Sequence, residues 1–377
     1  DLTGNRVVDI GPLSNLTELG QLYLGHNRIN DISPLSKLTK LWDLYLSSNQ
    51  ISDISPISNL TNLLWLGLDH NNIGDLNPLS SLTKLEGLDL AGNRITDISP
   101  LSNLVNLRRL NLGNNRIEDI SPLAGLNNLL KLYLENNQIN DIDALANLVN
   151  LHSLELSHNH RIINITPLAN LSKLERLGLS HTSVSNIAPL NNLTKLRSLD
   201  LVANRVSDLT PLSNLLHLRA VNLSHNLIWD IKPLSFLFDL EWLSLSENLV
   251  SDITPLANLK NLSTLLLSQN RISDISPLTN LPKLQSLDLR DNQVSDISPL
   301  VQNPGIGEGD YIDLRGNPLG DKAYEEDIPA LESRGVELLY DLREPSISFS
   351  DPNLETCLLY TSPSPRDLST SRMPSSA

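Results

Sequence analysis

The sequence predicts an α/β solenoid, in which short parallel strands line a concave face and short 3-10 turns cover the convex side. Three observations predict it. The chain repeats every 22 residues, turn-forming residues recur at fixed places in each repeat, and the apolar residues are mostly aliphatic. Of the 377 residues, 40% are hydrophobic but only 4% are aromatic. Leucine and isoleucine fill many similar layers, so this composition favours a repetitive core.

Each repeat is defined by seven apolar positions around one asparagine. In the repeat of Asn49 these positions hold Leu41, Leu44, Leu46, Ile51, Ile54, Ile57 and Leu60. The same frame recurs around a ladder of asparagines, which comprises Asn27, Asn49, Asn71, Asn93, Asn115, Asn137, Asn159, Asn204, Asn226, Asn248, Asn270 and Asn292. Thr182 takes this place in one repeat, and looser repeats surround Asn5 and Asn317, which gives about 15 repeats. The pattern Leu-x-x-Leu-x-Leu-x-x-Asn at this period is the leucine-rich-repeat signature, and it predicts a horseshoe.

The parts of one repeat follow from the residue spacing. Leu44 and Leu46 alternate with outward residues, as a half-buried strand requires. Asn49 follows the strand, where its amide can both donate to and accept from buried backbone groups. Next, Ser55 is expected to cap one helical turn that has Pro56 at its first position.

Two neighbouring repeats depart from the pattern. Thr182 replaces the ladder asparagine, and one extra residue follows Asn159. The turn aspartate also becomes asparagine at Asn164 and Asn186. These departures are interpreted as drift in a tolerant array. The alternative is a local change of curvature that shapes a ligand surface.

The phrase Asn-x-Ile-x-Asp-Ile-Ser-Pro-Leu/Ile-x-x-Leu resembles the repeats of the internalin family of bacterial surface proteins. It stands at Asn49–Leu60, Asn93–Leu104, Asn115–Leu126 and Asn270–Leu281. Cytosolic phosphatase-regulating relatives share the repeat length but generally lack this turn phrase. The resemblance covers roughly residues 1–344. It implies a protein that binds other proteins through its concave face.

The chain divides into four parts. Residues 1–318 are expected to form the solenoid, which begins inside a repeat and therefore reads as N-terminally truncated. Residues 319–344 are expected to form a C-terminal cap. Residues 345–356 resemble the start of a second internalin-type N-terminal cap. Residues 357–377, back-translated, resemble a sequencing-library transposase adaptor, so this tail is interpreted as non-biological.

The cap should contain one helix and one strand. Asp321–Arg334 places three apolar residues on one helical face, namely Tyr324, Ile328 and Leu331. Pro329 is expected to break this helix into two pieces, and Gly335 to end it. Val336–Tyr340 then has the pattern of a strand.

Charge and motifs exclude several classes of function. The formal net charge of −15 opposes binding to nucleic acids or anionic membranes. No apolar run is long enough to predict a transmembrane helix. The sequence has no phosphate-binding, zinc-protease or nucleophile-elbow motif. Gly305, Gly307 and Gly309 fit a loop better than a dinucleotide site. We therefore expect no enzyme, no cofactor and no metal.

The concave face carries the candidate binding residues. Of four Trp and seven Tyr residues, seven are expected to point out from the strands, namely Tyr23, Trp42, Tyr45, Trp65, Tyr133, Trp242 and Tyr311. Such residues are the commonest interface anchors. Arg109 and Lys131 belong to a basic middle region that is interleaved with carboxylates. The alternative interpretation is that these are solvated strand residues.

Three other groups of residues recur or cluster outside these concave positions. Five histidines share the position before the ladder residue, namely His26, His70, His158, His181 and His225, and they are interpreted as polar rim residues. The turn aspartates, from Asp31 to Asp296, are expected to accept backbone N–H bonds in their own turns, with calcium binding as the alternative. Phe236 and Phe238, with Trp229 in the same repeat, form a second candidate contact on the convex side.

Together these features predict a protein-binding module of a bacterial secreted or surface-attached protein, for ligand recognition or adhesion. The partner is expected to be another protein, with a host or cell-surface protein or a glycan as variants. Two alternatives stay open. One is a cytosolic regulatory scaffold that docks on an enzyme, and the other is a binding module of a larger multidomain enzyme.

Overall fold

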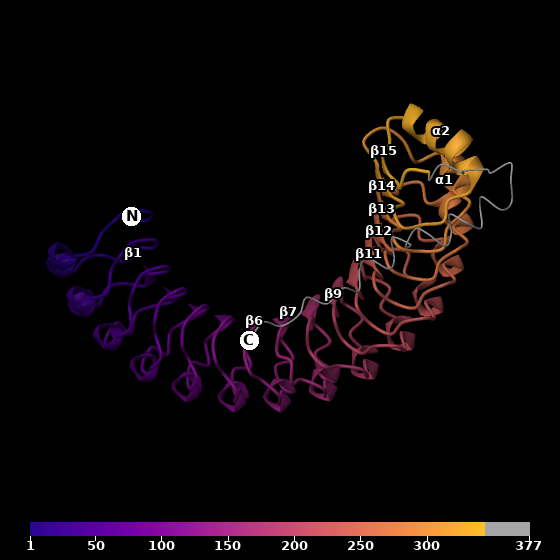
Figure 1. Ribbon diagram of the computed structural model, residues 1–377. Coiled ribbons are helices and arrows are strands. Elements are labelled where there is room, and N and C mark those ends of the chain that lie inside the picture. The colour runs from indigo at the N-terminus through magenta and orange to yellow at the C-terminus, as the bar shows by residue number, and fades with distance from the viewer. Residues whose placement is uncertain (344–377) are drawn as a thin grey trace, which may run out of the picture. The chain divides into compact units, whose positions relative to one another are not determined.

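A computed structural model describes residues 1–343, and within them residues 1–340 form one compact unit. In this unit fifteen strands form a single parallel sheet, in which each strand pairs with the next one along the chain. The sheet lines the inner side of an arc and the turns lie along its outer side (Figure 1). The predicted leucine-rich-repeat horseshoe with a concave parallel sheet and short 3-10 turns is thereby confirmed.

Every strand is three residues long. The strands are β1 Gln21–Tyr23, β2 Asp43–Tyr45, β3 Trp65–Gly67, β4 Gly87–Asp89, β5 Arg109–Asn111, β6 Lys131–Tyr133, β7 Ser153–Glu155, β8 Arg176–Gly178, β9 Ser198–Asp200, β10 Ala220–Asn222, β11 Trp242–Ser244, β12 Thr264–Leu266, β13 Ser286–Asp288, β14 Tyr311–Asp313 and β15 Glu337–Leu339. The register advances by one whole repeat per strand, so that Leu22 pairs with Leu44 and Leu44 with Leu66. Equivalent residues therefore form straight rows across the sheet.

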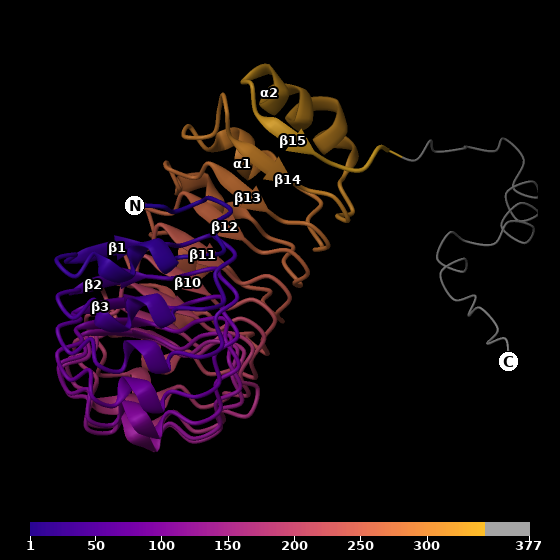
Figure 2. The ribbon, with the colours of Figure 1, turned by 90° about the vertical axis from the view of Figure 1, so that its left-hand side faces the viewer.

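Short helical turns occupy the convex side. The 3-10 turns are η1 Gly11–Asn15, η2 Ser33–Lys37, η3 Ser55–Ile57, η4 Asn77–Leu79, η5 Ser99–Leu101, η6 Ser121–Leu123, η7 Asp143–Leu145, η8 Thr166–Asn170, η9 Ala188–Leu190, η10 Thr210–Leu212, η11 Lys232–Leu234, η12 Thr254–Leu256 and η13 Ser276–Asn280. The other helical elements are α1 Ser298–Gln302, the π-helical η14 Ala323–Asp327 and α2 Ile328–Ser333. Figure 2 shows α2 and β15 at one end of the stack of repeats.

The core is a continuous column of aliphatic side chains. In the repeat of Asn49, six of the seven predicted apolar residues are fully buried, and Ile54 is 1% exposed. The same positions are buried in the neighbouring repeats. Because one repeat buries its apolar side chains only against the repeats beside it, the stability of the array is a sum over neighbour interfaces.

The turn is capped by a different residue from the one predicted. Ser55 is the first residue of η3, and Pro56 the second, rather than the cap and the first residue. The residue before the turn is Ile54, which makes no side-chain cap. Instead, the Asp53 carboxylate accepts the Ser55 N–H at 2.8 Å. This is the backbone N–H bond expected for the turn aspartates. It satisfies the N–H of Ser55 itself and not one of the later N–H groups that a Ser55 cap would bind.

The ladder asparagines join consecutive repeats. The Asn49 side-chain amide donates to the carbonyl of Leu24 in the preceding repeat and to that of Leu46 in its own, both at 3.0 Å. Its oxygen accepts the N–H of Ile29 from the preceding repeat at 3.0 Å. One side chain therefore satisfies buried donors and acceptors of two repeats.

The ladder is interrupted at Thr182. The Thr182 hydroxyl bonds to Leu179 O at 2.9 Å and to Asn204 Oδ1 at 2.7 Å, in its own repeat and the next. The N–H of Ile162, which a ladder asparagine would bind, donates instead to the carbonyl of Asn159 at 3.1 Å. The extra residue after Asn159 makes this local bond possible. We call the interface between the repeats of Asn159 and Thr182 the joint.

The five rim histidines have a backbone role that the sequence interpretation missed. All five adopt the left-handed conformation, with φ between 52° and 61°. Other repeats place residues such as Asn114, Asn136 and Gly92 at the same position. Asparagine, histidine and glycine tolerate positive φ readily, so the turn geometry favours them, while Ser48, Ala203, Glu247 and Gln269 adopt the same conformation in other repeats.

The C-terminal helical segment continues without the break expected at Pro329. The chain stays helical from η14 into α2, and Pro329 lies in the first turn of α2. A π-helical segment precedes it, so the wider turn accommodates the missing proline N–H. Ile328 and Leu331 are buried, and Gly335 follows the helix with φ of 81°. The expectations for residues 345–356 and 357–377 lie outside the described residues.

Candidate functional site on the concave face

Two positions of every strand point into the concave face, and the middle position points into the core. In β2, for example, Leu44 is fully buried while Tyr45 is 37% exposed. Because equivalent residues form rows, the side chains at these positions are neighbours across the sheet, roughly 4.8 Å apart from strand to strand. A surface of this kind is defined by which side chains fall next to one another in a row.

Four aromatic residues gather at the N-terminal end of this face. Tyr23, Trp42, Tyr45 and Trp65 belong to β1, to the residue before β2, to β2 and to β3. The Tyr23 and Tyr45 rings stack with their centroids 5.4 Å apart. Trp42, Tyr45 and Trp65 are 37% to 41% exposed. We call these four residues the aromatic cluster.

Glycines allow three rings of the cluster to pack against the backbone of the sheet. A Cβ on Gly87 would lie 2.0 Å from the Trp65 ring, and a Cβ on Gly67 would lie 2.7 Å from the Tyr45 ring. Trp65 and Tyr45 therefore rest on the backbone of the following strand. Trp42 leans the other way, over Gly20. Each ring keeps part of its surface open to the concave side, as an anchor requires.

Asp43 lies among these rings. It pairs in register with Gln21 on one side and Trp65 on the other, and Tyr45 follows it two residues later on the same face. Its Oδ2 accepts the Tyr23 hydroxyl at 2.7 Å and the Gln21 amide at 3.1 Å. Its Oδ1 is buried and has no protein hydrogen-bond partner.

The carboxylate of Asp43 affects both tyrosines. The hydrogen bond to Asp43 is the main reason that the pKa of Tyr23 is raised. Burial, followed by the Asp43 charge, raises the pKa of Tyr45. Both phenols therefore stay protonated at neutral pH, and Tyr23 acts as a hydrogen-bond donor to Asp43.

A hollow of about 190 Å³ adjoins the cluster on the side of the following repeats. Its lining includes Tyr45, Trp65, Gly87, Asp89 and Arg109. The hollow exists because Gly87 has no side chain at a position where most strands carry one. Burial raises the pKa of Asp89, although bonds from Ala91 N–H and Asn111 oppose it.

The predicted basic middle interleaves positive and negative charge. The cations lie in the first strand position or just before it, at Arg108, Arg109, Lys131, Arg176, Arg197 and Arg219. Carboxylates lie beside them just before the strands, at Glu86, Glu175 and Glu241, and also in the third position or two residues after it, at Asp69, Asp89, Glu135, Glu155 and Asp200. The Arg109 guanidinium lies over the Tyr133 ring, 5.6 Å from its centroid. Arg109, Lys131 and Tyr133 are thus neighbours, as β5 and β6 place them.

Trp242 and Tyr311 do not join the aromatic cluster. Trp242 lies in β11, eight strands from Trp65, which is roughly 40 Å along the row. Its neighbours in the row are Ala220 and Thr264. Tyr311 lies in β14 and directs its hydroxyl to Asp313 at 3.4 Å.

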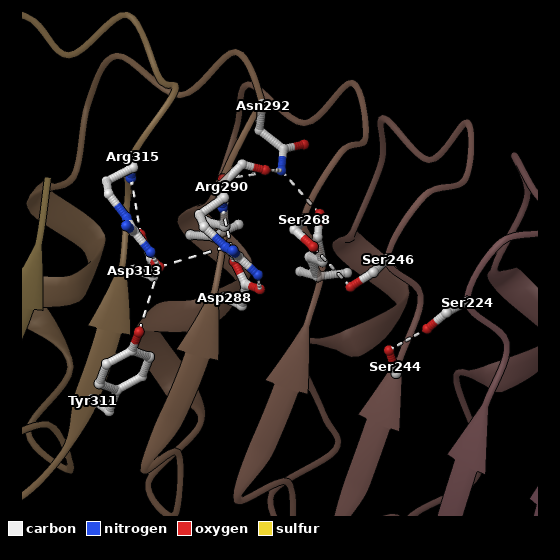
Figure 3. Close-up of polar contacts among 12 residues, drawn as sticks. Ser224, Ser244, Ser246, Ser268, Asp288, Arg290, Asn292, Tyr311, Asp313 and Arg315 are labelled. Atoms are coloured by element: carbon white, nitrogen blue, oxygen red, sulfur yellow. Dashed lines mark hydrogen bonds and ion pairs between the residues drawn. The ribbon is translucent and has the colours of Figure 1, made fainter. Parts of the chain in front are cut away.

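At the C-terminal end the concave carboxylates are paired with arginines (Figure 3). Arg290 donates to Asp288 through Nε at 2.9 Å and through Nη2 at 2.6 Å. Arg315 holds Asp313 in the same way. Burial would raise the pKa of Asp313, but these bonds outweigh it and hold the pKa below its usual value. Serine hydroxyls pair on the strands before, such as Ser224 with Ser244.

Two of the remaining groups form contacts outside this face. The His158 and His181 rings stack across the joint, with centroids 4.5 Å apart. Phe236 and Phe238 meet edge to face on the convex side and are 64% and 50% exposed. Among residues 1–343 no group of three or more His, Cys, Asp or Glu residues has an arrangement suited to a metal ion. In the same residues, no helix has the length and apolar character to cross a membrane.

The sequence reasoning missed Asp43 and the glycines of the aromatic cluster. A signal for the glycines existed, because Gly67 and Gly87 stand one repeat after Tyr45 and Trp65 at outward strand positions. A weak signal also marked Asp43, since it is an acidic residue at the first strand position, which among the described strands only Glu337 of β15 shares.

Comparison with known proteins finds leucine-rich repeats in several segments of the described array. The profile described as "Leucine Rich repeats (2 copies)" matches residues 21–59, 83–125, 172–214 and 260–302, and a second leucine-rich-repeat profile matches residues 105–160. An internalin of Listeria monocytogenes, InlF, is 34% identical with a TM-score of 0.76. That match covers 82% of this chain and 88% of the internalin. No curated protein sequence matches significantly.

Two more distant structures share the fold. A leucine-rich-repeat protein of Leptospira interrogans is 21% identical with a TM-score of 0.65, and the match covers 91% of this chain and 95% of that protein. The plant peptide hormone receptor RGFR1, solved in complex with RGF2, is 20% identical with a TM-score of 0.62, over 88% of this chain and 65% of the receptor. Both likenesses concern the fold alone.

Proposed function

This chain belongs to the leucine-rich-repeat proteins of internalin type, and we propose that it binds another protein through its concave face, with the aromatic cluster as the anchor. The observation that carries this proposal is the gathering of Tyr23, Trp42, Tyr45 and Trp65 at three successive strands. The rings of Trp42, Tyr45 and Trp65 lie over glycines, and Tyr23 stacks on Tyr45. A partner can cover them together, because they span only about 10 Å across the sheet.

The chemistry of the cluster suits a protein interface. Tyrosine and tryptophan have only two side-chain torsions each, so ordering them on binding costs little conformational entropy, and they dominate binding hot spots. The charged middle region around Arg109 and Lys131 adjoins the cluster and supplies the polar surface that usually surrounds such an anchor. The concave face therefore combines an aromatic cluster with a neighbouring region of mixed positive and negative charge.

We further propose that the protein acts outside a bacterial cell, as a secreted or surface-attached binding module. The support is its likeness to a Listeria internalin over most of both chains. The gene upstream of Asp1 tests this point, because a signal peptide encoded there is the expected result. A start codon directly before Asp1, with no signal peptide, would favour the cytosolic regulatory scaffold instead.

The binding proposal is tested with a matched pair of variants. The full chain selects binders from a displayed library of secreted and cell-surface protein domains, and the Kd of a selected partner is then measured. The double variant Tyr45→Ala, Trp65→Ala should weaken binding by at least about 2 kcal/mol, roughly thirtyfold. Trp229→Ala removes an indole that is 65% exposed outside the concave face, so it should leave the Kd unchanged.

Thermal melting separates lost contacts from lost folding. Trp65 covers the backbone of Gly87 but is 37% exposed, so Trp65→Ala should cost about 1 kcal/mol of stability, less than a core Trp→Ala change. A much larger loss would mean that the ring stabilises the fold more than it serves as an anchor. Unchanged affinity with an intact fold would move the contact to the region of Arg109 and Lys131.

A further inference from the structure

The carboxylate of Asp43 is buried with half of its hydrogen-bonding capacity unused. Asp43 is 7% exposed, and its Oδ1 has no partner among the described residues. Hydrogen bonds to Oδ2 come from Tyr23 and Gln21, which are both uncharged. No lysine or arginine forms an ion pair with it in residues 1–343. A buried carboxylate without a cation costs free energy, so its retention needs an explanation.

The other end of the same face shows how this chain treats concave carboxylates when they serve the fold. Asp288 and Asp313 are 8% and 1% exposed, and each is held by two bonds from an arginine two residues later (Figure 3). Asp43 lies at the first position of its strand rather than the third, and the residue two places after it is Tyr45, which offers a ring face and no cation. The cation that Asp288 and Asp313 receive from within the chain is therefore missing at Asp43.

We propose that the aromatic cluster is a receptor for a single lysine or arginine side chain of the partner protein, with Asp43 as its counter-ion. This inference rests on the proposed function and names the partner chemistry of that site. The net charge of −15 favours a partner with a basic segment.

The cluster offers what a cationic side chain needs. Its aliphatic stem packs on the ring faces of Tyr45 and Trp65, and its charged head lies near ring faces that attract cations. The head then donates to Asp43 Oδ1, which supplies the missing partner. Tyr45 and Trp65 are each 37% exposed and flank Asp43, which pairs in register with Trp65. Because Oδ1 is buried, the bound side chain reaches it when a flanking side chain changes rotamer.

A small probe tests the site without the natural partner. The full chain with Trp229→Phe and Trp242→Phe keeps only Trp42 and Trp65 of its four tryptophans, so its fluorescence reports the cluster. N-acetyl-L-arginine amide should produce a saturable change in the millimolar range. N-acetyl-L-citrulline amide has nearly the same shape without the charge, and it should bind at least tenfold more weakly.

Asp43→Asn in the same background decides the role of the carboxylate. It keeps an acceptor for Tyr23 but removes the charge, so arginine-probe binding should weaken at least tenfold while the melting temperature does not fall. The matched control is Asp200→Asn, a concave carboxylate on β9, which should leave the probe affinity unchanged. Equal binding of the two probes, no binding by the parent chain, or no effect of Asp43→Asn would each overturn the proposal.

The selected partner protein separates this inference from the proposed function. If Tyr45→Ala, Trp65→Ala abolishes partner binding but Asp43→Asn does not change the Kd, the concave face binds protein and the cation receptor is wrong. If neither variant changes the Kd, the anchor itself is misplaced. Loss of affinity in both supports the two proposals together.

Discussion

At the scale of single residues, the side-chain amide of one asparagine per repeat bonds backbone groups that have no partner in the sheet. After each strand the chain turns inward and buries carbonyls and N–H groups that no sheet partner reaches. The ladder asparagine is suited to this place because its side chain carries a donor and an acceptor on one planar group. Threonine has a single hydroxyl, and at Thr182 both regular cross-repeat bonds are absent. The difference between Asn and Thr is therefore a difference in how well two repeats are joined.

Asn115→Ala measures the worth of one ladder position. The Asn115 side chain donates to Leu90 O and Leu112 O and accepts from the Ile95 N–H, all at 3.0 Å. Its removal leaves these groups unpaired, so we expect a loss of about 1–3 kcal/mol in urea unfolding. Asn128→Ala is the control, because Asn128 is exposed and makes one bond, to Val105 O. Equal effects of the two changes would contradict the ladder's role.

Single residues also mark how far the sequence predicts the site. The aromatic residues could be placed on the concave face because strand periodicity alone decides which side chains point outward. The surroundings of Asp43 could not be predicted, since they depend on the Tyr23 hydroxyl and Gln21 amide reaching Oδ2 while Oδ1 stays buried without a protein partner. The glycines one repeat after Tyr45 and Trp65 are visible in the repeat pattern, but the pattern does not show that the rings lie over them.

At the scale of elements, the convex turn shows why a correct prediction can rest on a wrong detail. The phrase Asp-Ile-Ser-Pro predicted a short helical turn, and 3-10 turns lie there. The cap was assigned to Ser55 because serine before a proline is a common helix start. The tight 3-10 geometry instead brings the Ser55 N–H to the Asp53 carboxylate, two residues back. The aspartate bond was itself expected from the turn chemistry, and only the additional Ser55 cap is absent.

The turn aspartates give the array a predictable acid response. Backbone and hydroxyl bonds from Ser121 lower the pKa of Asp119, and bonds from Thr210 lower the pKa of Asp208. A lowered folded-state pKa contributes stability that is fully present above the unfolded value of about 3.9 and is lost as the pH falls through the folded value. Stability should therefore decline below about pH 4.

Asparagine tests this response, because Asn164 and Asn186 already accept the same turn bond, from Thr166 N–H at 3.0 Å and from Ala188 N–H at 2.9 Å. The variant Asp119→Asn, Asp208→Asn should lose less melting temperature between pH 6 and about pH 3 than the wild type. Glu118→Gln, Glu337→Gln changes the same number of exposed charges outside these turn bonds and serves as control. An equal flattening in the control would assign the effect to net charge alone.

At the scale of the whole described array, residues 1–340 behave as a line of coupled repeats rather than as a globule. Each repeat contacts only its neighbours, so the weakest interface sets where the array opens first. Most interior interfaces carry the two cross-repeat asparagine bonds, whereas the joint carries neither. Two smaller contacts cross it, from Ser180 N–H to Ser157 Oγ at 3.0 Å and from Ser183 Oγ to His160 O at 2.7 Å.

The joint should therefore be the least protected interior interface in hydrogen exchange. Amides of β7, β8 and the turns beside them are expected to exchange faster than those of β4 and β5, which a complete ladder joins. Thr182→Asn adds a side-chain amide that can donate to Leu156 O, which now accepts a bond from the Asn159 amide. The variant should therefore slow amide hydrogen exchange at the joint. Asn93→Thr is the converse variant: it should create a second fast-exchanging interface in a regular part of the array. Even protection across the joint in the wild type, with no new weak point in Asn93→Thr, would mean that leucine packing alone sets the coupling between repeats.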